Sequence, residues 1–195
     1  MKRVLERLKK FALGKNVLIL FLLTMLIYAT MLMYTIPMVQ SHAPDLALFD
    51  LSPTGYSYEH AASLLQELGL EGRQIYLTRQ LPLDFIYPGL FAISYSLFLL
   101  WLFSKGFKEN AKIFSLAFIP VFGGVFDYLE NICIIIMLKT FPTTSLMLVK
   151  ISSTFTLLKG IFTTLFFILL FVGIGAALLK NFKAKKLTKS LAKDI

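Results

Sequence analysis

Four long apolar segments divide the chain into alternating hydrophobic and polar stretches. The apolar segments cover residues 17–38, 85–103, 113–138 and 146–179. Because a helix rises about 1.5 Å per residue, about 20 residues cross a hydrocarbon core of about 30 Å. The last two segments exceed that length, so they must tilt or project beyond the lipid. The pattern predicts an all-α membrane protein, a four-transmembrane-helix bundle formed as a single integral membrane domain over residues 1–195.

Lysine and arginine residues gather on one side of this predicted bundle. They dominate the amphipathic segment 1–15, the connection between the second and third spans, and the basic tail 180–195. The connection between the first two spans (41–84) instead carries six acidic residues and two arginines. Because loops rich in Lys and Arg stay in the cytoplasm, we expect both termini to be cytoplasmic. We expect an integral, multi-pass protein of the bacterial plasma (inner) membrane.

The extracytoplasmic connection between the first two spans contains two stretches with helical spacing. In GYSYEHAASLLQELG the apolar side chains recur every three or four residues, with Ser57 placed as an N-cap and Gly69 as a stop. The stretch EGRQIYLTRQL leads into the second span, where Pro82 predicts a bend instead of one continuous helix. Together these stretches predict a short helical lid over the outer mouth of the bundle.

Composition removes several kinds of site from consideration. Of the 195 residues 57% are hydrophobic, and the chain has one cysteine, Cys133, and two histidines, His42 and His60. A disulfide framework or a thiolate cluster needs more cysteines, and haem and zinc sites usually use histidine. We therefore expect no metal site and no cofactor. The net charge of +9 follows the membrane topology, so the expected partners are membrane lipids and not nucleic acid.

The third span carries small and polar residues on one helical face. At 3.6 residues per turn this face holds Pro120, Gly123, Gly124, Asp127, Glu130, Asn131 and Ile134. Large apolar residues, among them Phe122, Val125, Leu129 and Ile136, point the other way. Glycines let a neighbouring helix approach closely in a membrane. We therefore expect the polar face to meet the rest of the bundle and the apolar face to meet lipid.

The fourth span supplies a basic counterpart, Lys159, on a stripe with Ser152, Thr156 and Thr163. Lys159 lies about 13 Å deeper than Lys150, near the mid-membrane level expected for Asp127 and Glu130. An ionised side chain at a helix centre costs about 2.5–3.5 kcal/mol, so such groups must be paired, neutralised or hydrated. We predict that the three groups interact in an outward-opening pocket. There Asp127 and Glu130 would act as acid and base and Lys159 would stabilise negative charge.

Other polar residues are candidates for ligand binding. They are Asn131 and Thr156 beside the charged groups, Tyr28, Asp84, Tyr87 and Tyr95 on the first two spans, and Arg73 and Arg79 in the connection. Asp84 has an alternative role as the N-cap of the second span. The tyrosines have an alternative role in packing, and the arginines either pair with nearby acids or recognise phosphate head groups.

Three functions are compatible with this pattern. The first is a pocket that binds, or also processes by acid–base chemistry, an amphiphilic lipid or isoprenoid. The second is a small proton- or cation-coupled transporter, which at 195 residues is expected to form a homodimer or a larger membrane complex. The third is an accessory or assembly subunit whose charged cluster is structural. The sequence favours binding of an amphiphile and leaves enzymatic activity open.

Overall fold

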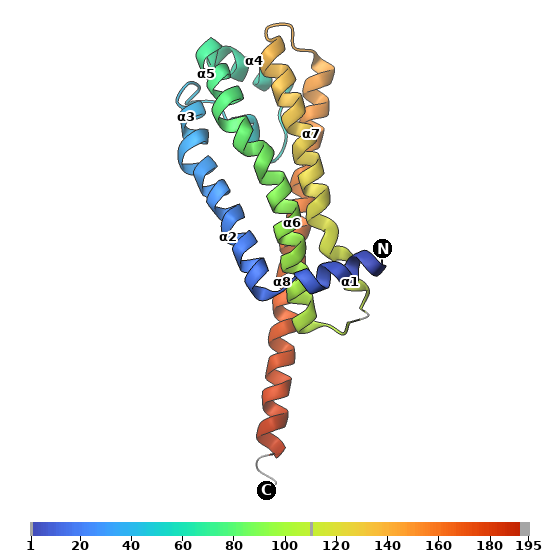
Figure 1. Ribbon diagram of the computed structural model, residues 1–195. Coiled ribbons are helices and arrows are strands. Elements are labelled where there is room, and N and C mark those ends of the chain that lie inside the picture. The colour runs from blue at the N-terminus through green and yellow to red at the C-terminus, as the bar shows by residue number, and fades with distance from the viewer. Residues whose placement is uncertain (1, 110, 192–195) are drawn as a thin grey trace.

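The computed structural model describes residues 2–109 and 111–191, apart from the side chains of 2–5, 9, 184, 185 and 187–191. Over these ranges the chain forms helices and connecting turns, without a strand. In order they are α1 (Lys2–Phe11), α2 (Gly14–Thr30), η1 (Met31–Thr35), α3 (Ile36–Gln40), η2 (Phe49–Leu51), α4 (Tyr58–Glu67), α5 (Gly69–Ile75), η3 (Tyr76–Gln80), α6 (Leu81–Gly106), η4 (Lys112–Phe118), α7 (Ile119–Thr140) and α8 (Leu146–Leu191). Figure 1 shows α8 extending well beyond the other helices. Residues 1 and 192–195 of the predicted terminal segments lie outside the described ranges.

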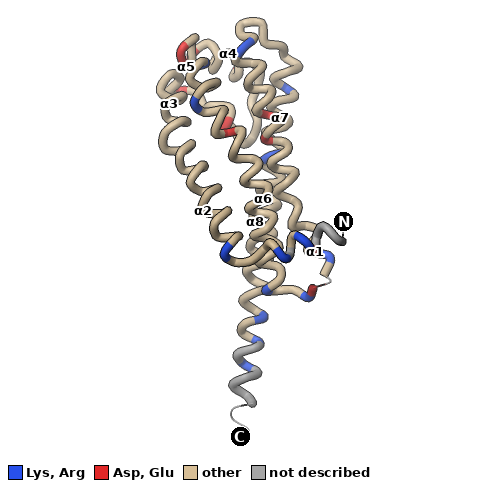
Figure 2. Tube along the Cα trace, viewed as in Figure 1, with Lys and Arg blue, Asp and Glu red and all other residues tan. Residues whose placement is uncertain are grey.

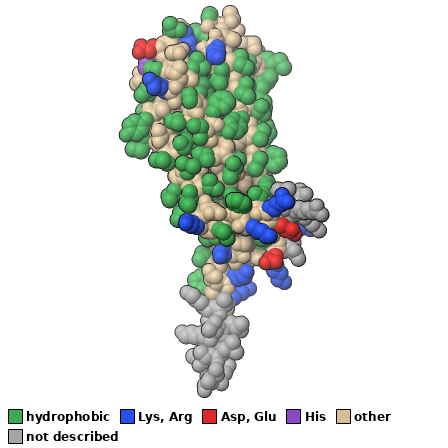
Figure 3. All heavy atoms as spheres, in the orientation of Figure 1, with side chains coloured by type: hydrophobic (Ala, Val, Ile, Leu, Met, Phe, Trp, Pro, Cys, Tyr) green, Lys and Arg blue, Asp and Glu red, His purple; other side chains and the backbone are tan. Residues whose placement is uncertain are grey.

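Four helices are long and apolar enough to cross a membrane, as the sequence predicts. They run over Gly14–Gln40, Gly69–Gly106, Lys112–Thr140 and Leu146–Lys183. Each contains one predicted apolar segment, and the second is longer than expected because it includes α5 and η3. Figure 3 shows a broad belt of hydrophobic side chains between the more polar ends of the molecule. The prediction of an all-helical chain with four helices able to span a membrane is therefore confirmed for the described residues.

The helix of the second span continues through Pro82, where the sequence predicts an interruption of the continuous helix. The helix passes through η3, a π-helical turn, in which the backbone N–H of Leu81 donates to the carbonyl of Tyr76, five residues back. Proline lacks a backbone donor and disturbs the preceding turn, and a π turn is one way in which a helix accommodates this. Asp84 consequently lies inside a continuous helix, so its predicted role as an N-cap is wrong.

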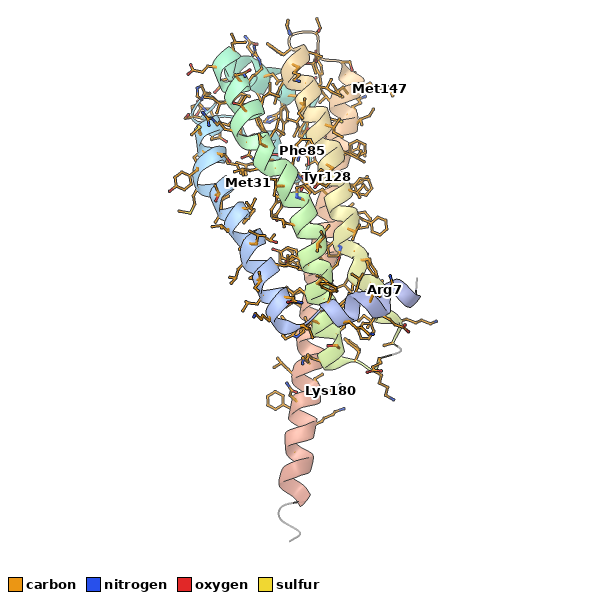
Figure 4. The ribbon with its side chains drawn as sticks, in the orientation of Figure 1. Arg7, Met31, Phe85, Tyr128, Met147 and Lys180 are labelled. Atoms are coloured by element: carbon orange, nitrogen blue, oxygen red, sulfur yellow. The ribbon has the colours of Figure 1, made fainter. Side chains whose placement is uncertain are left out.

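Helix α6 lies at the centre of the bundle, since α2, α7 and α8 all pack against it. Helices α7 and α8 also pack closely against each other. Gly124 explains the close approach of α6 and α7, because a Cβ atom there would lie 2.7 Å from the backbone oxygen of Pro88. Phe85 and Tyr128, labelled in Figure 4, extend this contact with ring centroids 5.9 Å apart. Helix α2 joins the bundle mainly through α6.

The two ends of the bundle differ in charge and in packing. Helix α1 lies across the bundle at the end where α8 leaves it (Figure 1), and Lys and Arg are most frequent there (Figure 2). Helices α4 and α5 lie at the opposite end (Figure 1). The connection that contains them has its own fully buried apolar residues, including Leu48, Phe49, Leu64 and Leu65. The connection is thus a packed part of the fold.

Candidate functional site

The polar face of α7 is buried in the bundle, as its helical spacing predicts. Pro120, Gly123, Gly124, Asp127, Glu130, Asn131 and Ile134 are all buried. Phe122, Val125 and Ile136 on the other side are exposed, and Leu129 is half-buried. The side chain of Glu130 is completely buried. The helix therefore presents two carboxylates and an amide to its neighbours instead of to lipid.

Lys159 of α8 bridges both carboxylates of α7. Its Nζ atom lies 3.2 Å from Oδ1 of Asp127 and 2.5 Å from Oε2 of Glu130. The hydroxyl of Thr156, one turn earlier on α8, donates to Oε1 of Glu130 at 2.6 Å. Both oxygens of Glu130 are thus occupied, and the positive charge of Lys159 is shared between two acids. The three predicted charged residues and Thr156 form one network between α7 and α8.

A cavity of about 440 Å³ lies beside this network. Its lining residues come from α2, η1, α3, η2, α6, α7, α8 and the turn after η2. They include Tyr28, Met31, Leu32, Asp50, Asp84, Tyr87, Phe91, Asp127, Lys159, Thr163 and Phe167. Figure 4 labels Met31, which marks the level of the cavity on the first span. The charged residues lie toward the end that holds α4 and α5. Aromatic and aliphatic residues continue the cavity lining toward the other end of the bundle, where α1 lies.

The structure brings only some of the predicted ligand-binding residues to this cavity. Tyr28, Asp84, Tyr87 and Thr156 line it. Asn131 lies behind them, where its amide donates to the backbone oxygen of Asp84 at 2.8 Å. It therefore fixes the position of α6 relative to α7 and does not face the cavity.

Three other predicted ligand-binding residues lie elsewhere. Tyr95 stacks on Phe166 deeper in the bundle, with ring centroids 4.6 Å apart. Arg73 donates to the backbone oxygen of Leu65 at 2.7 Å, and Arg79 is exposed. None of the three lines the cavity, because each points from its helix toward a different neighbour or toward solvent.

Asp50 is a site residue that the sequence reasoning missed. It belongs to η2 and lines the cavity, and its Oδ2 atom accepts hydrogen bonds from the Tyr76 hydroxyl at 2.7 Å and from the Gln80 amide at 3.5 Å. Gln80 in turn accepts a hydrogen bond from the Thr35 hydroxyl. The signal in the sequence was the apolar setting of Asp50 in LALFDL, unlike the polar surroundings of the other acids in this connection.

Asp84 and Asp50 are neighbours at the outer end of the cavity, the end nearest α4 and α5. Asp84 is 4% exposed, and its Oδ2 atom receives no hydrogen bond from the described residues. The same is true of Oδ1 of Asp50. Gln80, which donates to Asp50, lies one helical turn before Asp84, and both acids line the cavity. A second polar group, distinct from the Lys159 network, therefore borders the cavity.

Tyr56 fastens the connection to α8. Its hydroxyl donates to Oγ of Ser152 at 2.6 Å, and its backbone N–H donates to Oγ of Ser153 at 2.9 Å. Burial of the ring and hydroxyl raises the pKa of Tyr56 well above its usual value, because the tyrosinate form would lose its hydration. The residues that close the outer end of the cavity are thus tied to the same helix as Lys159.

Comparison with known proteins gives no match: no family model, no curated protein and no solved structure is significantly similar to this chain. The function must therefore be argued from the geometry of the cavity and its surroundings.

Proposed function

We propose that the protein binds an amphiphilic lipid or isoprenoid in the cavity between α2 and α8. The observation that carries this proposal is the exposure of residues that line the cavity. Tyr28, Leu32 and Phe167 line it and are 42%, 47% and 48% exposed on the outside of the bundle. The cavity therefore opens sideways, where an apolar chain can pass between the first and fourth spans into the surrounding lipid. A volume of about 440 Å³ suits a head group with the first part of a chain.

The number of residues between the charged groups and the basic ends of their helices supports a position near the extracytoplasmic boundary of the hydrocarbon core. Lys159 is 21 positions before Lys180, and Asp84 is 21 positions before Lys105. Each separation is a rise of about 30 Å, close to the thickness of the core. If the lysines mark the cytoplasmic boundary, as the positive-inside rule requires, the charged groups lie near the opposite boundary and not at the centre of the membrane.

This level matches the shape of an amphiphile. A head group would lie beside Asp84, and its chain would run along the apolar part of the lining, past Phe167, toward the end of the bundle where α1 lies. Asp50, Leu51 and Pro53 line the end of the cavity nearest α4 and α5. We assign the connection that holds α4 and α5 as a lid, which leaves the lateral route as the way in. In this proposed orientation in the membrane, both termini lie in the cytoplasm.

The proposal assigns binding, and not catalysis, to the Lys159 network. Both oxygens of Glu130 are occupied, one by Thr156 and one by Lys159. Asp127 shares the same ammonium group. A general acid or base needs a free oxygen or proton directed at its substrate. The network instead holds α7 and α8 together and forms one wall of the cavity.

Native mass spectrometry of the gently purified protein tests this proposal. We expect a co-purifying or added amphiphile to remain bound to the wild-type protein. Thr163→Trp places a large ring in the cavity wall and should lower the bound fraction at least tenfold. Ile161→Trp is the matched control, because Ile161 is exposed on α8 and does not line the cavity. Absence of any bound amphiphile, or equal retention by the two variants, would contradict the proposal.

A further inference from the structure

The charges around the cavity are unequal. Asp50, Asp84 and Asp127 line it, and Glu130 lies directly behind. Lys159 is the one basic residue among the described residues of its lining. Its ammonium group already contacts two carboxylates, which leaves it little capacity to attract an anionic head group. The acids at the outer end, Asp50 and Asp84, have no basic partner of their own at ion-pair distance within the described residues.

Asp50 and Asp84 bring two carboxyl groups to the same end of the cavity, each with one oxygen that receives no hydrogen bond from the described residues. Tyr76 and Gln80 both donate to Oδ2 of Asp50. Asp84 has no such donors on its Oδ2 atom and lies beside Asp50. Two neighbouring carboxylates repel each other, and a proton held by one of them removes that repulsion. Asp84 is suited to hold this proton, because it is 4% exposed and its Oδ2 atom has no donor.

Aromatic rings lie one and two helical turns from the acid pair. Asp84, Tyr87 and Phe91 occupy positions i, i+3 and i+7 of α6, so they share one face of that helix. The ring centroids of Tyr87 and Phe91 are 5.9 Å apart, and Tyr28 of α2 lies 5.5 Å from Tyr87. All three rings line the same cavity as Asp84. Carboxylates above a group of aromatic faces are the surroundings that favour an ammonium group.

We propose that the Asp50–Asp84 pair and these rings take the ammonium group of a cationic amphiphile, in exchange for the proton that the two acids share. The O–H bond of Asp84 breaks, the proton passes to water, and the ammonium group lies between two carboxylates without forming a covalent bond. The charge of the site is unchanged by this exchange. The inference rests on the proposed function, since it names the class of ligand that the cavity takes.

The exchange makes binding depend on pH. The charged and titratable groups that face Asp84 are Asp50 of η2, Tyr76 of η3, Asp127 of α7 and Lys159 of α8. Because the bound state carries one proton fewer, affinity for the cation should rise with pH, by up to about tenfold per pH unit while the pair holds its proton.

Calorimetry on the full-length protein in neutral maltoside micelles tests the inference, with dodecyltrimethylammonium and dodecyl phosphate as probes. The quaternary ammonium has no proton to lose, so a released proton must come from the protein. We expect the cation to bind at least tenfold more tightly than the phosphate. Titrations in two buffers of different ionisation enthalpy should show release of about one proton per bound cation.

Asp84→Asn keeps the size of the side chain and removes the exchangeable proton. We expect it to weaken binding of the cation at least tenfold and to abolish proton release. Asp45→Asn is the control, because Asp45 is an exposed acid of the same connection. If Asp84→Asn fails to fold, the proton release and pH dependence of the wild-type protein still decide the question.

The outcomes separate this inference from the proposed function. Preference for dodecyl phosphate would overturn the cationic ligand and leave amphiphile binding intact. Cation binding without proton release, or binding unaffected by Asp84→Asn, would overturn the exchange at the acid pair. Failure of both probes, together with absence of any amphiphile in native mass spectrometry, would overturn the proposed function itself.

Discussion

Replacement of Lys159 by methionine is the most direct perturbation of the charged network. Methionine keeps much of the length of the lysine side chain and removes its charge. Asp127 and Glu130 then lose the ammonium group that lies 3.2 and 2.5 Å from their oxygens. Glu130 keeps the hydrogen bond from Thr156. Both carboxylates lose the positive charge of Lys159 that compensates their own negative charge.

The expected magnitude follows from the burial of the two acids. Asp127 is 6% and Glu130 0% exposed, so neither can recover full hydration after the lysine is lost. Removal of one partner from a buried ion pair costs about 3–5 kcal/mol. We expect Lys159→Met to lower the free energy of unfolding by about 3 kcal/mol, the lower end of that range, because proximity to the membrane boundary allows some hydration.

Reversible unfolding in mixed micelles of increasing sodium dodecyl sulfate fraction, followed by circular dichroism, measures this loss. Lys150→Met is the matched control, since Lys150 is an exposed lysine of the same helix and should change stability by less than about 0.5 kcal/mol. Adding Glu130→Gln to Lys159→Met should recover part of the loss, since one uncompensated charge is removed. Equal stability of the two methionine variants would refute the reasoning that the network is buried and energetically coupled.

Three further predictions concern other parts of the structure. Tyr56→Phe should lower stability by about 1 kcal/mol in the same unfolding assay, because the Ser152 hydroxyl loses its donor. Because burial raises the pKa of Tyr56, the folded state disfavours the tyrosinate. Its stabilising contribution is therefore present below pH about 10 and lost as the pH rises further, and ultraviolet titration should show one resistant tyrosine fewer in Tyr56→Phe than in the wild-type protein. Gly124→Ala should cost about 1–3 kcal/mol, since its Cβ would meet backbone at 2.7 Å, whereas Gly175→Ala, with open space around it, should not destabilise the protein in thermal melts.

Parts of the site could be predicted from the sequence because they depend on a single helix. The spacing of Gly123, Gly124, Asp127 and Glu130 fixes them on one face of α7, and every one of them is buried. The match in level between Lys159 and the two acids follows from the uniform rise of a helix, and the structure brings these residues into contact. The continuity of the helix through Pro82 was not predicted, because a π turn accommodates the proline without ending the helix.

The residues that were missed or misplaced depend on contacts between distant segments. Asp50 reaches the cavity because η2 folds back onto η3, where its partners Tyr76 and Gln80 lie 26 and 30 positions later in the chain. No local periodicity describes that contact. Tyr95 and Arg73 had suitable chemistry and suitable segments, and the packing of neighbouring helices turned them toward Phe166 and the backbone of Leu65.

The sequence by itself determined the four spans and the buried polar face of α7, because hydrophobic length and helical period act within one segment. Only the tertiary structure decided that α2 stands apart from α8 far enough to leave a cavity, and that Asp50 joins Asp84 at its outer end. The physical reason is that a cavity is the space left by several helices packing at once. Its shape and its charge therefore depend on all of their side chains together.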